Sequence, residues 1–262
     1  MIKLTFYGGV NEIGGNKVLL EDADTHVFLD FGMSFSFGAD YFTGFLQPRR
    51  VSGLEDYFEL NLLPKLEGLY SEDMLAGTEL RYSEPRFDGV VLSHAHVDHV
   101  GHAHFLDENI PLFCGYGTKI ILDALKESGG YDYGQHVCET FRTGNRIKVG
   151  NIEIEPVHVD HSIPAAYGFI AHTSGGAVVY TGDIRLHGPM FHMTEEFVEN
   201  AQNAEPDIMI CEGTRINPKE RRSNYSEAEV KKLSNDIVSR TRKIVICSFY
   251  GRDIDRFKTF YT

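Results

Sequence analysis

The sequence has few cysteines, no long apolar run and too few basic residues to balance its acidic ones. Its four cysteines form no Cys-x-x-Cys pair, which argues against a disulfide framework or a zinc ribbon and predicts buried thiols. No stretch approaches the roughly 18 apolar residues of a membrane span, and the first residues lack the charged and apolar regions of a secretory signal. We therefore expect no membrane partner and a cytoplasmic location.

The charge balance bears on the partner of the protein. The chain carries 38 acidic and 25 basic residues, for a formal net charge of -13. Nucleic-acid binding needs Lys and Arg to neutralise phosphates, so the average charge argues against such a partner. Two local basic clusters nevertheless keep a nucleic-acid partner open. For both clusters the alternative is a solvated surface. They are Arg49 with Arg50, and Arg215 with Lys219, Arg221 and Arg222.

The run from Ser93 to His99, directly after the apolar residues 89–92, is the most informative motif. Because side chains alternate along extended backbone, we expect His94, His96 and Asp98 to face one side and His99 to turn away. The pattern predicts two metal ions, with two imidazoles on one and a carboxylate and an imidazole on the other. The alternative is a polar turn with surface histidines, which four ligand-type residues within six positions disfavour.

The segment His94-Ala95-His96-Val97-Asp98-His99 resembles the His-x-His-x-Asp-His signature of the metallo-β-lactamase superfamily. The resemblance implies an α/β fold, a four-layer αββα sandwich with the metals at one edge between the sheets. It also implies a later histidine before Ser-Ile-Pro and a bridging aspartate after a strand. The implied ligands are His94, His96 and His161 for the first ion, Asp98 and His99 for the second, and Asp183 for both.

The remaining pattern predicts an organisation of strands and helices around these motifs. We expect a metallo-β-lactamase domain over residues 1–225, in which an insertion over residues 34–86 shapes the mouth of the site. The expected strands include a meander over residues 3–30, a buried strand at 207–211 and another strand at 243–247. The expected helices include 54–66, 116–127, a capped helix from 226 to 240, and an amphipathic helix over 252–261. The chain stops inside this expected helix, and two interpretations stay open: a chain that is cut short there, or a natural end on a helix.

Three segments further resemble the β-CASP RNA-processing nucleases of the ribonuclease J type, including archaeal ones. They are residues 8–16, residues 161–164 and residues 212–215. In that branch Glu212 matches an acidic motif residue; the alternative is a strand-end carboxylate that caps local backbone. Residues 226–262 resemble the start of a β-CASP domain, and the missing remainder implies that the second metal lacks its last ligand here. Asp30, at the end of an early strand, is either a turn carboxylate or the partner of a ligand imidazole.

The resemblance implies a zinc-dependent ribonuclease that cleaves single-stranded RNA with a hydroxide held between two Zn²⁺ ions. The implied catalytic residues are Asp98, Asp183 and Glu212. Two alternatives stay open: a small-molecule hydrolase of thioesters, lactones or phosphodiesters, and a non-enzymatic binding module on the same fold. A homodimer also stays open as the assembly. The sequence does not distinguish RNA from DNA or internal from terminal cleavage.

Overall fold

The computed structural model describes residues 2–39, 41–42, 46–216, 219, 221 and 223–261. The strands of this part are β1 (Ile2–Gly8), β2 (Lys17–Asp22), β3 (Thr25–Leu29), β4 (Gly89–Leu92), β5 (Leu112–Gly115), β6 (Cys138–Phe141), β7 (Ile147–Val149), β8 (Ile152–Val159), β9 (Ala166–Thr173), β10 (Gly176–Tyr180) and β11 (Ile208–Ile210). Its α-helices are α1 (Glu55–Glu59), α2 (Val97–Val100), α3 (Tyr116–Glu127), α4 (Phe191–Asn203), α5 (Glu227–Arg240) and α6 (Ile254–Tyr261).

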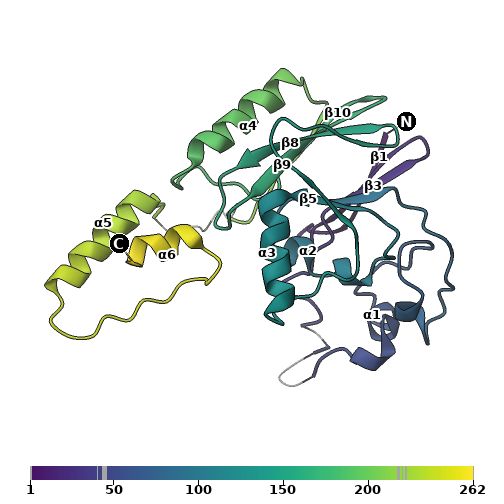
Figure 1. Ribbon diagram of the computed structural model, residues 1–262, viewed down its shortest axis with the longest axis horizontal. Coiled ribbons are helices and arrows are strands. Elements are labelled where there is room, and N and C mark those ends of the chain that lie inside the picture. The colour runs from purple at the N-terminus through teal and green to yellow at the C-terminus, as the bar shows by residue number, and fades with distance from the viewer. Residues whose placement is uncertain are drawn as a thin grey trace.

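The first sheet has the strand order β1-β2-β3-β4-β5-β6 (Figure 1). Its first three strands form the predicted antiparallel meander, and β3 to β6 then run parallel to one another. Leu29 near the end of β3 pairs with Val91 near the end of β4. Parallel pairing therefore brings Asp30, which follows β3, to the same sheet edge as Ser93 and His94, which follow β4.

The second sheet has the strand order β11-β10-β9-β8-β7. Both β8 and β10 are antiparallel to β9, while β11 is parallel to β10. The strands β8, β10 and β11 therefore run in one direction and end at one edge. His161, Asp183 and Glu212 follow these three strands, so the second sheet brings them together although they are far apart in the sequence.

The sheets pack face to face, and helices cover their outer faces (Figure 1). In β2, Val18 and Leu20 join the core between the sheets with Phe169 and Tyr180, whereas Leu19 points to the opposite face. This alternation is the period of two that an extended strand imposes. Each fully buried Leu or Phe contributes about 1.5–3 kcal/mol of transfer free energy, so this core fixes how the two edges face each other.

Two further cores complete the layers. Phe197 of α4 packs against Val157 and Val179 on the outer face of the second sheet. Leu122 of α3 and Leu54 from the segment before α1 lie in the core outside the first sheet. The order is therefore helix, sheet, sheet, helix, which confirms the α/β four-layer prediction. Among the helices that the structure describes, none combines the length and the apolar character of a membrane span.

Several expected elements differ from the structure. The predicted strand at 243–247 is irregular, and Ile244 and Ile246 are each 88% exposed. No strand in the described ranges pairs with it, and an apolar run forms a strand only where a neighbour supplies hydrogen bonds. The prediction of a buried strand at 207–211 is wrong in burial, because β11 lies at the sheet edge and Met209 is 66% exposed.

Two other corrections are local. The predicted helix over 54–66 is confined to α1, and Pro64 cannot supply a helical backbone donor. Cys114 is buried as predicted, but Cys211 and Cys247 are exposed, because Cys211 directly follows the edge strand β11 and Cys247 lies in the irregular segment. The capped helix is confirmed: the Ser226 hydroxyl accepts from the Glu229 backbone, and the Glu229 carboxylate accepts from the Ser226 backbone.

Candidate metal centre

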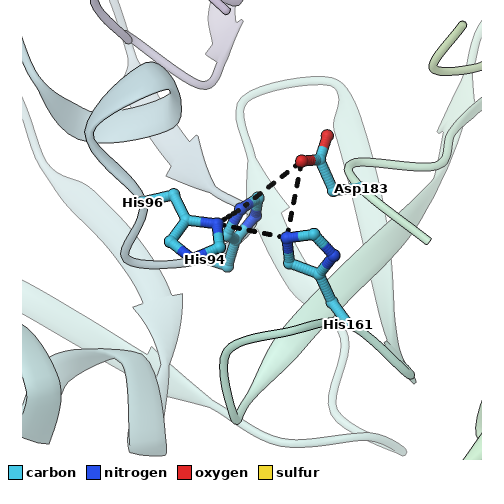
Figure 2. A group of neighbouring side chains, drawn as sticks. All are labelled: His94, His96, His161 and Asp183. Carbon is cyan, nitrogen blue, oxygen red and sulfur yellow. Dashed lines mark hydrogen bonds and ion pairs between the residues drawn. The ribbon is translucent and has the colours of Figure 1, made fainter. Parts of the chain in front are cut away.

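Three strand ends and one short helix bring the predicted ligands together. His94 and His96 lie in the loop after β4, His161 follows β8, and Asp183 follows β10 (Figure 2). The backbone is extended at His96, with φ -76 and ψ 147, and helix α2 begins at the next residue. The expected alternation therefore fails beyond His96, because a helix carries Asp98 and its neighbour His99 instead of a strand.

The first ligand group consists of His94, His96, His161 and Asp183, whose ligand atoms all lie within 4.8 Å of one another. His96 Nδ1 lies 3.0 Å from His94 Nε2 and 3.1 Å from His161 Nε2. Asp183 Oδ2 lies 3.9 Å from His94 Nε2 and 3.5 Å from His161 Nε2. Three imidazole nitrogens and one carboxylate oxygen therefore converge on one point, as Figure 2 shows.

The protonation of these imidazoles suits a cation. Burial lowers the pKa of His94 well below its usual value, that of His96 to about 4 and that of His161 to about 3. At neutral pH the rings carry no net charge, so each can turn an unprotonated nitrogen toward a cation while its one proton sits on the other nitrogen. A divalent cation among them would satisfy all three, and three imidazoles with one carboxylate are a donor set that Zn²⁺ takes.

The second ligand group consists of Asp98, His99 and Asp183. His99 Nε2 lies 3.3 Å from Asp183 Oδ1 and 3.4 Å from Asp98 Oδ2. Asp183 thus offers one oxygen to each group. Burial raises the pKa of this carboxyl, but the hydrogen bond from His99 and the nearby imidazoles outweigh burial and lower it to about 2. The carboxylate is therefore ionised at neutral pH.

A fully buried carboxylate, Asp30, orients His99. His99 Nδ1 lies 2.7 Å from Asp30 Oδ2, which also accepts from the Tyr180 hydroxyl at 2.7 Å and from Ser93 Oγ at 2.8 Å. The Ser93 backbone N–H donates to Asp30 Oδ1 at 2.7 Å. Burial by itself lowers the pKa of His99, but the Asp30 charge and the Asp183 contacts raise it well above its usual value.

This arrangement settles the two readings of Asp30 in favour of the imidazole partner. With Nδ1 bonded to Asp30, His99 turns Nε2 toward Asp98 and Asp183. The roles of Ser93 and Tyr180 were missed in the sequence. A tyrosine in the apolar strand before Asp183 was the available signal, because a buried phenol requires a hydrogen-bond partner.

Two glycines permit a close approach of the neighbouring chain to α2. A Cβ at Gly32 would lie 1.7 Å from the Asp98 carbonyl oxygen, and one at Gly14 would lie 2.6 Å from Asp98 Cβ. Gly14 also has φ +78, a conformation that L side chains rarely adopt. The helix that carries Asp98 and His99 can therefore occupy its position only if positions 14 and 32 are glycines.

Glu212 belongs to neither ligand group. Its Oε1 accepts from the Ile184 backbone N–H at 3.1 Å, and its own N–H donates to Thr181 Oγ1 at 3.3 Å. These bonds fix the turn on both sides of Asp183. Glu212 also lines a cavity of about 560 Å³ together with Asp98, His99 and Asp183.

The two basic clusters have different surroundings. Arg49 forms ion pairs with Asp56 at 2.6 Å and Glu55 at 3.0 Å, which fits a solvated surface. Arg215 donates to Asn224 Oδ1 at 2.5 Å on the segment after Glu212. Arg222 lies outside the described residues, and the side chain of Arg50 is not described either.

Comparison with known proteins agrees with this geometry. The beta-lactamase superfamily domain matches residues 71–243. Ribonuclease J of Helicobacter pylori is 25% identical over 265 residues, covering 97% of this chain and 34% of the relative. Ribonuclease J of Pyrococcus abyssi is 26% identical over 247 residues, covering 90% of this chain and 50% of the relative.

One solved structure is similar over almost the whole chain. It is a protein of unknown function from Enterococcus faecalis V583, with a TM-score of 0.79 and 26% identity, covering 98% of this chain and 62% of that one. The chain spans about a third to a half of the length of the two ribonuclease J relatives.

Proposed function

We propose that this chain, which belongs to the metallo-β-lactamase superfamily, hydrolyses phosphodiester bonds of single-stranded RNA with two Zn²⁺ ions. The observation that carries the proposal is the pair of ligand groups that share Asp183. Two-metal hydrolases use such a pair to activate water and to neutralise charge on the substrate, whereas a binding module has no use for a carboxylate that bridges two sets of ligands. The similarity to two ribonucleases J supports RNA as the substrate class.

The residues present fit the ions. His94, His96 and His161 would hold one, Asp98 and His99 the other, and Asp183 both. When bound, two such ions supply Lewis-acid activation of water near neutral pH and neutralise charge on a phosphoryl group. The second group has one ligand fewer than the first, so we expect it to bind its ion more weakly.

The protein's own residues have separate tasks in this proposal. Asp30 holds the proton on His99 Nδ1 and keeps Nε2 directed at the ligand group. Glu212 holds the Ile184 N–H and with it the backbone that presents Asp183. The cavity beside Asp98 and Asp183 leaves room for a nucleotide next to the reactive phosphate. We assign residues 226–262 to the start of a β-CASP domain, which would hold the strand.

Cleavage of 5′-labelled single-stranded RNA by the zinc-loaded protein tests the proposal. We expect cleavage by the wild type and its loss in Asp98→Ala, which removes one ligand of the second group. The product ladder then distinguishes internal from terminal attack. Equal cleavage by wild type and Asp98→Ala would contradict the role of the second group.

A second candidate is a small-molecule hydrolase, which the cavity of about 560 Å³ beside the second ligand group favours. This volume lies within the usual range for small-molecule sites, roughly 300–1,000 Å³. Zinc binding without RNA cleavage, together with Asp98-dependent hydrolysis of a thioester, lactone or small phosphodiester, would favour this candidate.

A further inference from the structure

The segment between α5 and α6 returns to the metal centre and brings an aromatic side chain to it. The Tyr250 ring centroid lies 5.5 Å from that of His96, with the ring planes at 66°. The guanidinium of Arg252 lies 5.7 Å from the Tyr250 ring centroid. Tyr250 remains 51% exposed despite both contacts. An exposed aromatic ring and a cation therefore lie beside a member of the first ligand group.

A buried ion network fixes this segment to the rest of the protein. Arg185, 8% exposed, donates from Nε to Asp160 Oδ1 at 2.8 Å and from Nη2 to Asp255 Oδ2 at 2.7 Å. Asp160 directly precedes His161, and Asp255 lies in the first turn of α6. One arginine thus joins α6 to the loop that carries a predicted metal ligand.

A second contact holds the start of α5 to the same network. Arg256 of α6 donates to Glu227 of α5 through Nε at 3.0 Å and Nη2 at 2.7 Å, and the Glu227 N–H donates to the His187 carbonyl at 2.9 Å. Removing one partner from a buried charge network is costly, so the position of Tyr250 and Arg252 is defined by more than the irregular segment itself.

We propose that Tyr250 and Arg252 form a nucleotide platform: the Tyr250 ring stacks on a base of the RNA strand, and the Arg252 guanidinium binds a neighbouring phosphate. The inference rests on the proposed RNA hydrolase function and names residues that would hold its substrate. Aromatic rings bind single strands by stacking on bases of any type, and arginine tracks the backbone. Arg252 also supplies positive charge at the site of a chain whose net charge is -13.

The position of the platform defines which nucleotide it contacts. Neighbouring stacked bases are roughly 3.4 Å apart along a strand. A ring 5.5 Å from the imidazole of His96 therefore contacts a nucleotide next to the reactive phosphate, or one position further. The cavity lined by Asp98, His99 and Asp183 adjoins the second ligand group instead. The RNA strand would thus contact the protein on both sides of the shared Asp183.

Fluorescence anisotropy with a labelled phosphorothioate oligouridylate tests the platform on the zinc-loaded protein, with a gel to check that the probe stays intact. We expect Tyr250→Ala to raise the dissociation constant about tenfold, within the range for loss of one stacked base. Tyr250→Leu should weaken binding as much, since it keeps apolar volume without an aromatic face, whereas Tyr250→Phe should stay within about twofold of wild type.

The matched control is Tyr261→Ala, because that ring is 80% exposed on the last turn of α6 and stacks on Phe257. Its affinity should equal that of wild type. Arg252→Ala should make the dependence of log affinity on log salt less steep, by about the amount that one phosphate contact contributes.

The outcomes separate the platform from the proposed function. Unchanged affinity in Tyr250→Ala, with wild type that binds and cleaves RNA, overturns the platform and leaves the function intact. Equal weakening in Tyr250→Phe also overturns it, because the aromatic face is retained. Wild type that neither binds the oligouridylate nor cleaves RNA overturns both.

Discussion

The two ligand groups share Asp183 but are built in different ways. In the first group, burial keeps three imidazoles neutral, and a hydroxyl rather than a carboxylate lies behind His94, with Ser93 Oγ 3.0 Å from His94 Nδ1. In the second, the buried carboxylate Asp30 holds one imidazole by a hydrogen bond and keeps its pKa high. The first group is therefore ready for a cation without losing a proton, whereas His99 must release one. Two neighbouring metal sites can thus respond differently to acid and to mutation.

The substitution with the largest expected effect removes Asp183, the carboxylate that the two ligand groups share. Asp183→Ala takes an oxygen from each group, so we expect most bound zinc and all hydrolysis to be lost. Zinc content by atomic absorption and RNA cleavage measure the two consequences. Asp24→Ala, in the exposed turn between β2 and β3, is the control and should keep both. A variant of Asp183 that retains zinc and turnover would refute the shared ligand.

The second-largest expected effect should differ between the two ligand groups. Asp30→Asn keeps the size of the side chain but removes the charge that faces His99 Nδ1. We expect affinity for the second ion to fall about 10–100-fold, as for lost partners of ligand histidines, while the first ion stays bound. The free energy of unfolding should fall by about 2 kcal/mol, because Asp30 accepts charge-assisted bonds from three residues.

Zinc titration with a competing indicator measures both affinities, and urea unfolding measures stability. Asp88→Asn is the control, since Asp88 accepts the His26 N–H at 2.7 Å but its side chain is 42% exposed. Parallel losses at both ligand groups would contradict a role of Asp30 confined to His99.

A lower pH should weaken metal binding at the second ligand group more than at the first. The pKa of His99 is raised, so at neutral pH and below an ion must displace a proton, and its affinity falls about tenfold per pH unit. The pKa values of His96 and His161 are lowered to about 4 and about 3, so the first group has no proton to release above about pH 5. Affinity for the first ion should therefore be flat from about pH 5 to 8. Calorimetry in buffers of different ionisation enthalpy detects the released proton, and equal pH slopes for both ions would contradict the contrast.

The smallest effect concerns Glu212, outside both groups. Glu212→Gln keeps an oxygen for the Ile184 N–H but removes a charge from the cavity. We expect a several-fold fall in kcat with unchanged zinc content, measured on labelled RNA. Unaltered turnover would leave Glu212 as a strand-end carboxylate that caps local backbone.

What the sequence could predict depended on the range of the interactions. The spacing from His94 to His99 predicted a metal-binding loop, and the resemblance to the metallo-β-lactamase superfamily, rather than the spacing, supplied His161 and Asp183. Local signals also sufficed for the capping box at Ser226. The strand predicted at 243–247 failed, since a strand requires a partner that apolar periodicity does not reveal.

The hydrogen bonds around Asp30 could not be predicted from local sequence signals. Ser93 and His99 reach this carboxylate from one loop and Tyr180 from β10, and only tertiary packing brings these two parts of the chain to Asp30. The start of α2 at Val97 was missed as well, although it decides where Asp98 and His99 point. No residue within the motif itself marks the change from extended to helical backbone.

The Arg185 network has a consequence for hydrogen exchange. Arg185 joins Asp160, the residue before His161, to Asp255 in α6. Segments joined through a buried charge open together, because neither can leave without stranding the other's ion. Amide protons of α6 and of the loop after β8 should therefore exchange as one cooperative unit. In Asp255→Asn, α6 should exchange on its own. Any slow exchange that remains in the loop after β8 would then be due only to the second sheet, which holds that loop.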